Sequence, residues 1–266
     1  MKEVKKGEFF GSHYQKIKFE DVIITDTEYI HAKVDWHYHE NPYFTYLLEG
    51  KLFEENKKKS YFLTPGSLLF HNWQDSHHNI KPPEYTRGFH IDLSANWFTK
   101  NNISLQDFEG SLDLKNPLLK GAMNKIFLET KIKDIHTEAS IELLIIDIFN
   151  KISNSQLKNS LTKPKWLKSL EELILETDMD YSLTHLSEQL NIHPVHLSRE
   201  FTNHFGITLG QYIRHLKLNR AINLLLEKKH SMTEICYKCG FYDQSHFIKN
   251  FKSVYKINPS SFLKHL

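Results

Sequence analysis

The stretch SMTEICYKCGFYDQSHFIKNFKSVYKINPSSF, residues 231–262, decides the fold of the C-terminal part of the chain. Ser231 and Glu234 have the spacing of a capping box, a pattern that begins a helix. Gly240 supplies the tight turn after that helix, because glycine adopts left-handed backbone angles at no steric cost. Apolar side chains on both sides of the turn have helical spacing and would face inward: Ile235, Cys239, Phe247 and Phe251. The stretch therefore predicts two helices joined by a tight turn.

A related copy of this pattern lies about fifty residues upstream. Ser182 can cap its first helix, Asn191 tolerates a left-handed turn, and Pro194 suits the first turn of the next helix. That next helix would bury three residues at helical spacing: Leu197, Phe201 and Phe205. Between the copies, Thr208–Glu227 begins with another capping box and spans roughly 30 Å as a helix. Because successive major-groove faces of B-DNA lie ~34 Å apart, one chain could place two helices in adjacent grooves.

Each copy is predicted to leave one face of its second helix open to solvent. In the first copy this face carries Val195, Ser198, Arg199 and Thr202; in the second copy it carries Gln244, Ser245, Ile248 and Lys249. Arg and Lys pair with guanine and Gln pairs with adenine, so these faces suit the reading of a major groove. We therefore predict a tandem helix-turn-helix that binds double-stranded DNA, from roughly Lys163 to Leu266. The alternative is an ordinary all-helical protein-interaction domain.

The charge distribution agrees with this prediction without establishing it. Residues 161–266 hold 14 Lys and Arg against 10 Asp and Glu, a net charge of +4, whereas residues 1–160 hold 20 against 22, a net charge of −2. A phosphate backbone would meet the basic half. The first ten residues do not resemble a signal peptide, and the chain has no run of 18 apolar residues. We expect a cytoplasmic protein with no membrane partner.

The N-terminal half has the short alternating segments of an antiparallel sandwich or small barrel. The predicted strands are Val22–His31, Tyr43–Phe53, Tyr61–Phe70 and Thr86–Leu93. Helical periodicity follows in Pro117–Lys131 and Thr137–Ile152, and the polar stretch Ser153–Pro164 is predicted to be a linker. The two helices would pack on the strands or form a dimer seam. The expected fold class is α+β with two domains. Residues 1–115 would form the barrel and residues 116–152 a helical segment for packing or dimerisation. Residues 153–164 would be the linker and residues 165–266 the tandem helix-turn-helix.

The two C-terminal copies resemble the arabinose-regulator (AraC/XylS-type) family of bacterial transcription factors. The resemblance rests on three segments, of which GF-x-D-Q-S-x-F at residues 240–247 is the most specific: Ser182–Gly206, Tyr212–Leu225 and Ile235–Phe262. It implies an activator that binds promoter DNA, forms a homodimer, contacts RNA polymerase and joins the tandem unit to a cupin-like sensing barrel. The implied groove-facing residues are Val195, Ser198, Arg199, Gln244, Ser245, Ile248 and Lys249. Val195 and Ile248 stand where relatives carry Arg or Gln and would make only apolar contacts.

The N-terminal half is similar to the cupin pattern, which begins with a His-x-His pair. His37 and His39, with His77 or His78, could supply three imidazoles to a transition metal. The carboxylate that a metal-binding cupin places a few residues later is misplaced, because Glu40 follows directly and would point to the opposite strand face. Sensing barrels of the resembled family often keep such a start without a metal. We therefore predict no metal and no cofactor, and expect structural or ligand-contacting histidines.

Aromatic residues in the same half indicate a small-molecule pocket, with a sugar as one candidate. They are Trp36, Tyr38, Tyr46, Trp73 and Phe89. The predicted ligand-binding residues are His37, His39, Tyr46, Trp73 and His77. A barrel filled by its own side chains is the alternative to a ligand.

The two cysteines form a Cys236-x-x-Cys239 pair that resembles half of a zinc or redox site. No second pair completes a zinc site, and the segments around the pair have no strand character. We expect both to be small apolar core residues, as buried free cysteines usually are.

Together these patterns predict a ligand-responsive transcription regulator, not an enzyme. Two alternatives remain open on the sequence alone. One is a metal-dependent cupin enzyme with a DNA-binding tail, and the other is a constitutive regulator whose N-terminal domain serves only for dimerisation.

Overall fold

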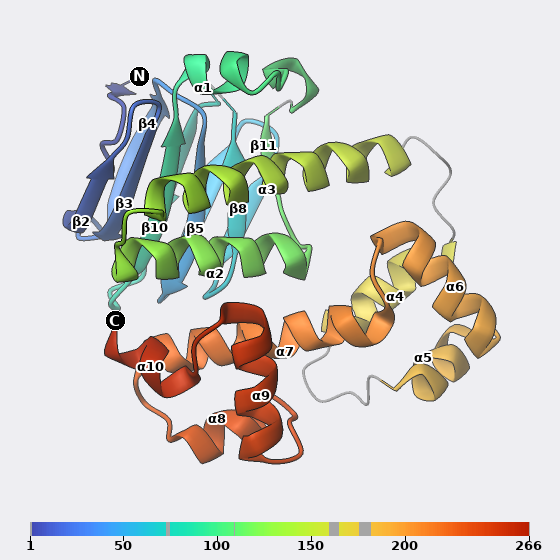
Figure 1. Ribbon diagram of the computed structural model, residues 1–266. Coiled ribbons are helices and arrows are strands. Elements are labelled where there is room, and N and C mark those ends of the chain that lie inside the picture. Colours follow the sequence, from blue (N-terminus) through green and yellow to red (C-terminus); the bar gives the residue numbers. More distant parts are fainter. Residues whose placement is uncertain (1, 73–74, 109, 160–164, 176–181, 266) are drawn as a thin grey trace.

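The structure is a computed structural model that describes residues 2–72, 75–108, 110–159, 165–175 and 182–265. Its N-terminal part consists of two β-sheets and a pair of long helices, and its C-terminal part is helical throughout the described ranges (Figure 1). The predicted α+β class with a helical C-terminal domain is confirmed. None of the described helices is both long and apolar enough to cross a bilayer.

The first sheet has the strand order β1 (Lys2–Val4), β4 (Lys33–His39), β9 (His77–Ile80), β6 (Leu52–Asn56) and β7 (Ser60–Leu63). The second has the order β11 (Ser111–Asp113), β8 (Leu68–His71), β5 (Tyr43–Glu49), β10 (Arg87–Leu93), β3 (Val22–Glu28) and β2 (Ser12–Lys18). Among the described strands, only β1 and β4 pair in parallel. The two sheets share no paired strands in the described ranges, so the domain is an antiparallel sandwich and not a closed barrel.

The inner strands of the six-stranded sheet, β3, β5, β8 and β10, are buried on both faces, whereas its edge strand β2 is largely exposed. One face packs against the five-stranded sheet, where the rings of His39 on β4 and Tyr43 on β5 lie 4.3 Å apart. The other face packs against α2 (Pro117–Ile132) and α3 (Thr137–Asn159), which lie across it in Figure 1. The Phe89 and Phe127 rings meet there at 5.3 Å. Of the two alternatives left open for these helices, packing on the strands is the one that the structure shows.

Two predicted strands, Tyr43–Phe53 and Tyr61–Phe70, are wrong as single strands, because the chain crosses from one sheet to the other within each. The crossings occur at Gly50 and Gly66, which have φ angles of 77° and 84°. A Cβ atom on Gly50 would lie 2.1 Å from the carbonyl oxygen of Tyr85, so only glycine fits that corner. Short elements beyond the four predicted strands complete this half: α1 (Ala95–Lys100), the 3-10 turn Leu105–Asp107, and the strands β1, β2, β4, β9 and β11.

The predicted linker Ser153–Pro164 is also wrong in its first half. Helix α3 continues to Asn159, and residues 160–164 lie outside the described residues. Ser and Asn have only modest helix propensity, but propensity is a weak determinant beside packing. Ile152, immediately before this segment, is buried within the core, which favours continuation of the helix.

The C-terminal part contains α4 (Lys165–Leu175), α5 (Leu183–Leu190), α6 (Pro194–Phe205), α7 (Leu209–Glu227), α8 (Met232–Lys238), α9 (Gln244–Tyr255) and α10 (Pro259–Lys264). Its first half, α4 to α6 with the start of α7, has its own hydrophobic core around Leu186, Leu197 and Phe201. Its second half does not. The buried apolar residues of α7 from Leu218 onward and of α8 to α10 belong to the same continuous core as the N-terminal sheets and helices.

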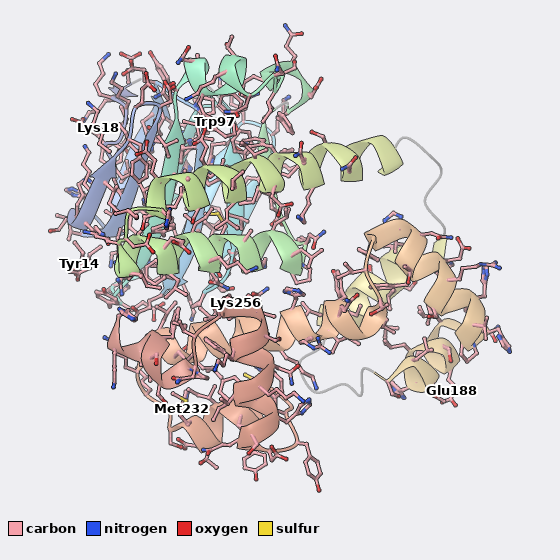
Figure 2. The ribbon with its side chains drawn as sticks, in the orientation of Figure 1. Tyr14, Lys18, Trp97, Glu188, Met232 and Lys256 are labelled. Carbon is pink, nitrogen blue, oxygen red and sulfur yellow. The ribbon has the colours of Figure 1, made fainter. Side chains whose placement is uncertain are left out.

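Figure 1 shows the consequence of these two cores. Helix α7 runs beneath α2, and α8 to α10 lie beside it, whereas α5 and α6 project to one side. Figure 2 places Lys256, which follows α9, at the border with the N-terminal domain, and Glu188 of α5 away from it. The second helix-turn-helix unit is thus docked on the N-terminal domain, and the first extends from it on the far end of α7.

Candidate functional site

The first helix-turn-helix unit consists of α5 and α6. The Ser182 side chain accepts a hydrogen bond from the backbone amide of His185, which caps α5. Asn191 then adopts the left-handed conformation with a φ of 51°, and Pro194 begins α6. Leu197 and Phe201 are fully buried beneath α6. These local features were all predicted from the sequence, because each depends on residues only a few positions apart.

The second unit, α8 and α9, has the same plan. A reciprocal capping box joins Ser231 and Glu234 at the start of α8. Gly240 turns the chain with a φ of 68°, and its carbonyl accepts a hydrogen bond from the Lys217 ammonium. Asp243 caps α9 by accepting from the backbone amide of His246. These bonds fix the angle at which α9 leaves the turn.

The seven predicted reading residues fall into two groups, each on one side of its helix. Val195 and Arg199 are exposed on α6, with Ser198 half-buried between them. The four residues of α9 are exposed: Gln244, Ser245, Ile248 and Lys249. The two apolar members keep much of their surface in water, with 69% of Val195 and 40% of Ile248 exposed. Both helices already bury their opposite faces in a core, so this exposed apolar surface is available for contact with a partner.

Two of the polar reading residues have partners within their own unit. The Arg199 guanidinium lies 3.3 Å from Glu200 and 3.2 Å from a ring nitrogen of His196. The Gln244 amide donates to the Thr233 hydroxyl at 2.8 Å. Ion pairs this exposed contribute little to stability, so Arg199 can exchange its contacts for a base or phosphate at small cost.

Helix α7 joins the two units. Its capping box between Thr208 and Gln211 is present as predicted, and its 19 residues give a length of about 28 Å at 1.5 Å per residue. Three fully buried residues hold it in the shared core: Leu218, Ile222 and Leu225. The spacer between the two exposed faces is therefore a single rigid helix.

The two cysteines lie in the core of the second unit. Cys236 and Cys239 are free thiols with exposed fractions of 0% and 3%. Burial raises the pKa of the Cys239 thiol to about 12, so it carries no charge at neutral pH. A neutral buried thiol neither binds metal nor reacts readily. The pair packs as small apolar side chains.

A second candidate site lies between the two sheets of the N-terminal domain. His37 and His39 point to the same side of β4, and His37 pairs in register with His77 on the neighbouring strand β9. One ring nitrogen from each of these three buried histidines lies within 4.8 Å of the others. The sequence predicted this grouping, because residues two apart on a strand share a face.

The surroundings hold these imidazoles neutral and fix two of their tautomers. The Nδ1 atoms of His37 and His77 lie 2.8 Å and 3.0 Å from the backbone carbonyls of Asp35 and Asp75, so both must carry the proton. Their Nε2 atoms are left with lone pairs, and that of His77 accepts from the Tyr43 hydroxyl at 3.1 Å. Burial, aided by the neighbouring His77, lowers the pKa of His37 to about 4.

The sequence did not identify several residues around the cluster. Phe9 stacks on His39 and on His90, with ring centroids 5.0 Å and 3.7 Å away. Glu54 and His71 approach within 3.5 Å, and burial raises the pKa of Glu54 to about 8. Phe9 lies in a segment whose apolar residues follow no helical or strand periodicity. Glu54 is a charged residue of a type that sequence patterns place on the exposed side of a strand. Their role depends on contacts between distant segments, which a local pattern does not reveal.

The predicted aromatic pocket is wrong. Tyr46 and Phe89 are fully buried on the opposite face of the six-stranded sheet, toward α2. Trp36 lies on the outer face of the other sheet, where its ring meets His78 at 4.9 Å. Tyr38 neighbours both histidines on β4 and therefore points away from them. Trp73 lies outside the described residues.

Two cavities that described residues of this domain line differ greatly in size. The one at the histidine cluster has a free volume of about 20 Å³. The other, of about 510 Å³, is open to solvent beside Tyr14, Tyr85, Arg87 and Lys131. A water molecule needs about 10–15 Å³ and drug-sized ligands need about 300–1,000 Å³, so the open cavity has room for a sugar and the cavity at the histidine cluster does not.

A buried polar network connects the N-terminal domain to the second helix-turn-helix unit. The Tyr46 hydroxyl on β5 donates to Asn124 of α2 at 2.8 Å. The Asn124 amide donates to Asn219 of α7 at 3.1 Å and lies 3.4 Å from the Tyr255 hydroxyl of α9. Asn219 also donates to the carbonyl of Pro117. Four elements are therefore joined through side chains excluded from water.

Comparison with known proteins agrees with the helical geometry. The family described as "Helix-turn-helix domain" matches residues 186–265. The HTH-type transcriptional activator RhaS of Salmonella arizonae is 36% identical over 74 residues, which cover 28% of this chain and 27% of the relative. The chain thus aligns with about a quarter of the length of such curated relatives.

Solved structures include proteins similar to the whole chain and to its parts. An apo form of ToxT from Vibrio cholerae is 15% identical, with 91% of this chain and 97% of that chain covered and a TM-score of 0.39. The C-terminal domain of the response regulator yesN from Fusobacterium nucleatum is 30% identical over 38% of this chain and 99% of its own, with a TM-score of 0.36. A cupin-2 protein from Shewanella frigidimarina is 16% identical over 32% of this chain and 84% of its own, with a TM-score of 0.28.

Proposed function

We propose that the C-terminal domain is an AraC/XylS-type tandem helix-turn-helix and that the whole chain is a sequence-specific transcription regulator. The observation that carries the proposal is the pair of exposed faces on α6 and α9, held apart by α7. In this proposal Val195, Ser198 and Arg199 enter one major groove. The residues that enter the next are Gln244, Ser245, Ile248 and Lys249. Arg199, Gln244 and Lys249 would supply the hydrogen bonds, and Val195 and Ile248 apolar contacts such as a thymine methyl.

The N-terminal domain is proposed to sense an effector at the histidine cluster, with a binding role and not a catalytic one. Strand β5 supports this role because it contacts both sides of the sheet. Its Tyr43 bonds to His77 in the cluster, and its Tyr46 bonds to Asn124 in the network that reaches α7 and α9. An occupant that moves β5 would therefore change the contacts of the DNA-binding domain. A metabolite of sugar size would have to use the open cavity beside Arg87 instead.

Replacing Arg199 by alanine should weaken binding to the specific operator by about 1–3 kcal/mol and relax preference at one base pair. Mobility shifts on DNA upstream of the chain's own gene, with random DNA as competitor, measure both effects. Lys100→Ala is the matched control, since it removes one exposed charge from α1, outside the C-terminal domain. An equal loss on specific and random DNA would show that Arg199 contacts phosphate and not a base.

We further propose that the regulator acts as a homodimer and as an activator that contacts RNA polymerase. Two apolar side chains at α3 support the dimer, because Ile135 before the helix is 93% exposed and Leu143 within it is 67% exposed. Leu143→Asp should shift the protein toward monomer in sedimentation experiments without lowering its thermal stability. A monomeric wild-type protein at micromolar concentration would contradict the dimer.

A further inference from the structure

We propose that the open cavity between β2 and the end of α2 binds a small phosphorylated metabolite through Arg87, Lys131 and Lys133. Its free volume of about 510 Å³ falls within the range of small-molecule sites. The inference rests on the proposed function in one respect, because it gives the chemical class of an effector that the histidine cluster is too small to hold.

Segments far apart in the sequence form this cavity. Tyr14 belongs to β2 and Arg87 begins β10, whereas Lys131 lies in the last turn of α2 and Lys133 directly follows that helix. Figure 2 shows Tyr14 beside the end of α2 that leads into α3. A ligand in the cavity would therefore contact the sheet and the helix at the same time.

The end of α2 is already attached to β2 by polar bonds at the cavity wall. The Gln15 side chain donates to the Thr130 carbonyl at 2.9 Å, and its oxygen accepts from the Lys131 ammonium at 2.8 Å. Helix α2 also carries Asn124, which bonds to α7 in the network between the domains. An occupant of the cavity thus acts on the helix that contacts the DNA-binding domain.

Two cations of the lining have hydrogen-bond donors to spare. Arg87 gives two of its five N–H groups to Asp26 and a third, at 3.4 Å, to Glu49, so two have no partner among the described residues. Lys131 donates to Gln15 and to Asp26, which leaves one of its three N–H groups without a partner in the same ranges. Asp26 and Glu49 lie behind these cations and do not line the cavity.

Lys133 adds a positive charge that no described carboxylate neutralises. Its side chain is exposed, and its ammonium forms neither a hydrogen bond nor an ion pair with the residues that the structure describes. Burial lowers the pKa of Lys131, the charges of Arg87 and Lys133 lower it further, and Asp26 opposes them. The three cations therefore repel one another across the cavity, and a bound anion would relieve this repulsion.

The chemistry of the lining selects the charged group of the ligand. Arg and Lys donate hydrogen bonds but accept none, so the site suits a ligand rich in acceptors. A phosphate monoester has three strong acceptor oxygens and a charge of about −1.5 to −2 at pH 7. Guanidinium groups bind phosphate through two parallel hydrogen bonds, and ammonium groups bind it as point charges. A neutral sugar would need acceptors for its own hydroxyl protons, of which this lining has few.

Two tyrosines indicate that the ligand is larger than a free phosphate ion. Tyr14 and Tyr85 are 55% and 45% exposed, and their hydroxyls lie 3.3 Å apart at the cavity. The Arg87 guanidinium lies 5.4 Å from the centre of the Tyr14 ring. Aromatic rings beside a few polar groups are typical of sites that hold an organic molecule. The carbon skeleton of the metabolite would pack against these rings.

The test titrates the full chain in a calorimeter with glucose 6-phosphate, glucose and inorganic phosphate at constant ionic strength. We expect one equivalent of glucose 6-phosphate to bind per chain, about tenfold more tightly than glucose or phosphate, because it alone uses both the cations and the rings. Lys133→Gln should weaken this binding about threefold, the effect of one exposed charge, and Lys133→Glu should abolish it. Both variants should keep the wild-type thermal midpoint, since the side chain is exposed.

Lys115→Glu is the matched control. Its lysine precedes α2 at the opposite end of the helix, pairs with Asp113 and has 71% of its side chain in solvent. Binding of glucose 6-phosphate should be unchanged in this variant. A loss equal to that in Lys133→Glu would mean that net charge alone governs binding, which would overturn the inference.

Titration of the wild-type chain provides a test that depends on no substitution. No binding of glucose 6-phosphate, or equal affinity for glucose or for inorganic phosphate, would contradict the inference, as would unchanged binding in both Lys133 variants. Mobility shifts on the same preparations separate the two proposals. A chain that binds DNA but not glucose 6-phosphate refutes only this inference, and a chain that binds glucose 6-phosphate but no DNA refutes only the proposed function.

Discussion

Replacing Asp26 by asparagine should lower the free energy of unfolding by about 3 kcal/mol at neutral pH, because it removes the buried carboxylate that Arg87 and Lys131 share. Arg87 then keeps only its longer contact to Glu49, and Lys131 only its hydrogen bond to Gln15. Arg87 donates two hydrogen bonds of 2.7 Å to the carboxylate, and Lys131 donates a third of 2.6 Å. Asp26 has an exposed fraction of 1%. Since Lys131 belongs to the last turn of α2, the substitution also loosens the attachment of that helix to the sheet. Urea unfolding measures the change.

The same group sets a pH dependence. Burial would raise the pKa of Asp26, but the hydrogen bonds and charges of Arg87 and Lys131 outweigh it and hold this pKa below the ordinary value of 3.8. A depressed folded-state pKa means that the stabilisation is complete above pH 3.8 and is lost as the pH falls through the folded-state value. The difference in free energy of unfolding between the wild-type protein and Asp26→Asn should therefore be largest at pH 7 and should shrink as the pH falls below 3.8.

Asp35→Asn is the control for this experiment. Asp35 makes an exposed ion pair with Lys33, and 86% of its side chain is in solvent. Exposed pairs contribute about 0–1 kcal/mol, so stability should barely change. A loss for Asp26→Asn no larger than for Asp35→Asn would mean that the buried triad does not stabilise the fold.

The C-terminal helices could be predicted closely because their signals are local. The capping residues Ser182, Thr208 and Ser231 each bond within three residues, and the turns at Asn191 and Gly240 depend only on backbone preference. Helix α6 begins at Pro194, as predicted, and ends at Phe205, the last of the three apolar residues by which it was predicted. Helix capping and turn chemistry of this kind can be read directly from the order of residues.

The N-terminal domain was predicted less well, for two physical reasons. Strands β4 and β9 each contain two histidines, β4 also holds Lys33 and Asp35, and both strands lack the β-branched run by which strands are usually found. The histidines could be grouped because residues two apart on one strand share a face. A pattern of period two does not say, however, which face of a strand meets the other sheet and which meets the helices. Tyr46 was therefore assigned to the wrong face, although its strand was predicted correctly up to Glu49.

The contact between the two domains could not be predicted at all. It joins Asn124 to Asn219 and to Tyr255, residues 95 and 131 positions apart, and no periodic pattern marks a polar side chain that meets another across a core. Both asparagines lie on helices whose apolar residues decided their assignment. Their pairing follows only from the way α2 and α7 pack together.

Replacing Asn124 by alanine should destabilise the protein by about 3 kcal/mol, because it strips buried partners from Tyr46 and Asn219. It should also increase amide hydrogen exchange in α7 more than in α5, which has a separate core. Asn96→Ala removes an exposed asparagine bond to Asp21 and should have almost no effect on either measurement. Uniform acceleration of exchange over all helices would show global unfolding and not a specific loosening of the domain contact.

A double-mutant cycle then decides whether the network transmits a change from the sensing domain to the DNA-binding domain. Tyr46→Phe removes only the hydroxyl on β5, and Asn219→Ala removes the acceptor on α7; Asn124 lies between them. Groups that share one buried partner usually show coupling energies of about 0.5–3 kcal/mol. We expect coupling in that range both for unfolding and for operator binding. Additive effects in operator binding would mean that β5 and α7 respond independently, and that an occupant of the histidine cluster acts on DNA binding by another route.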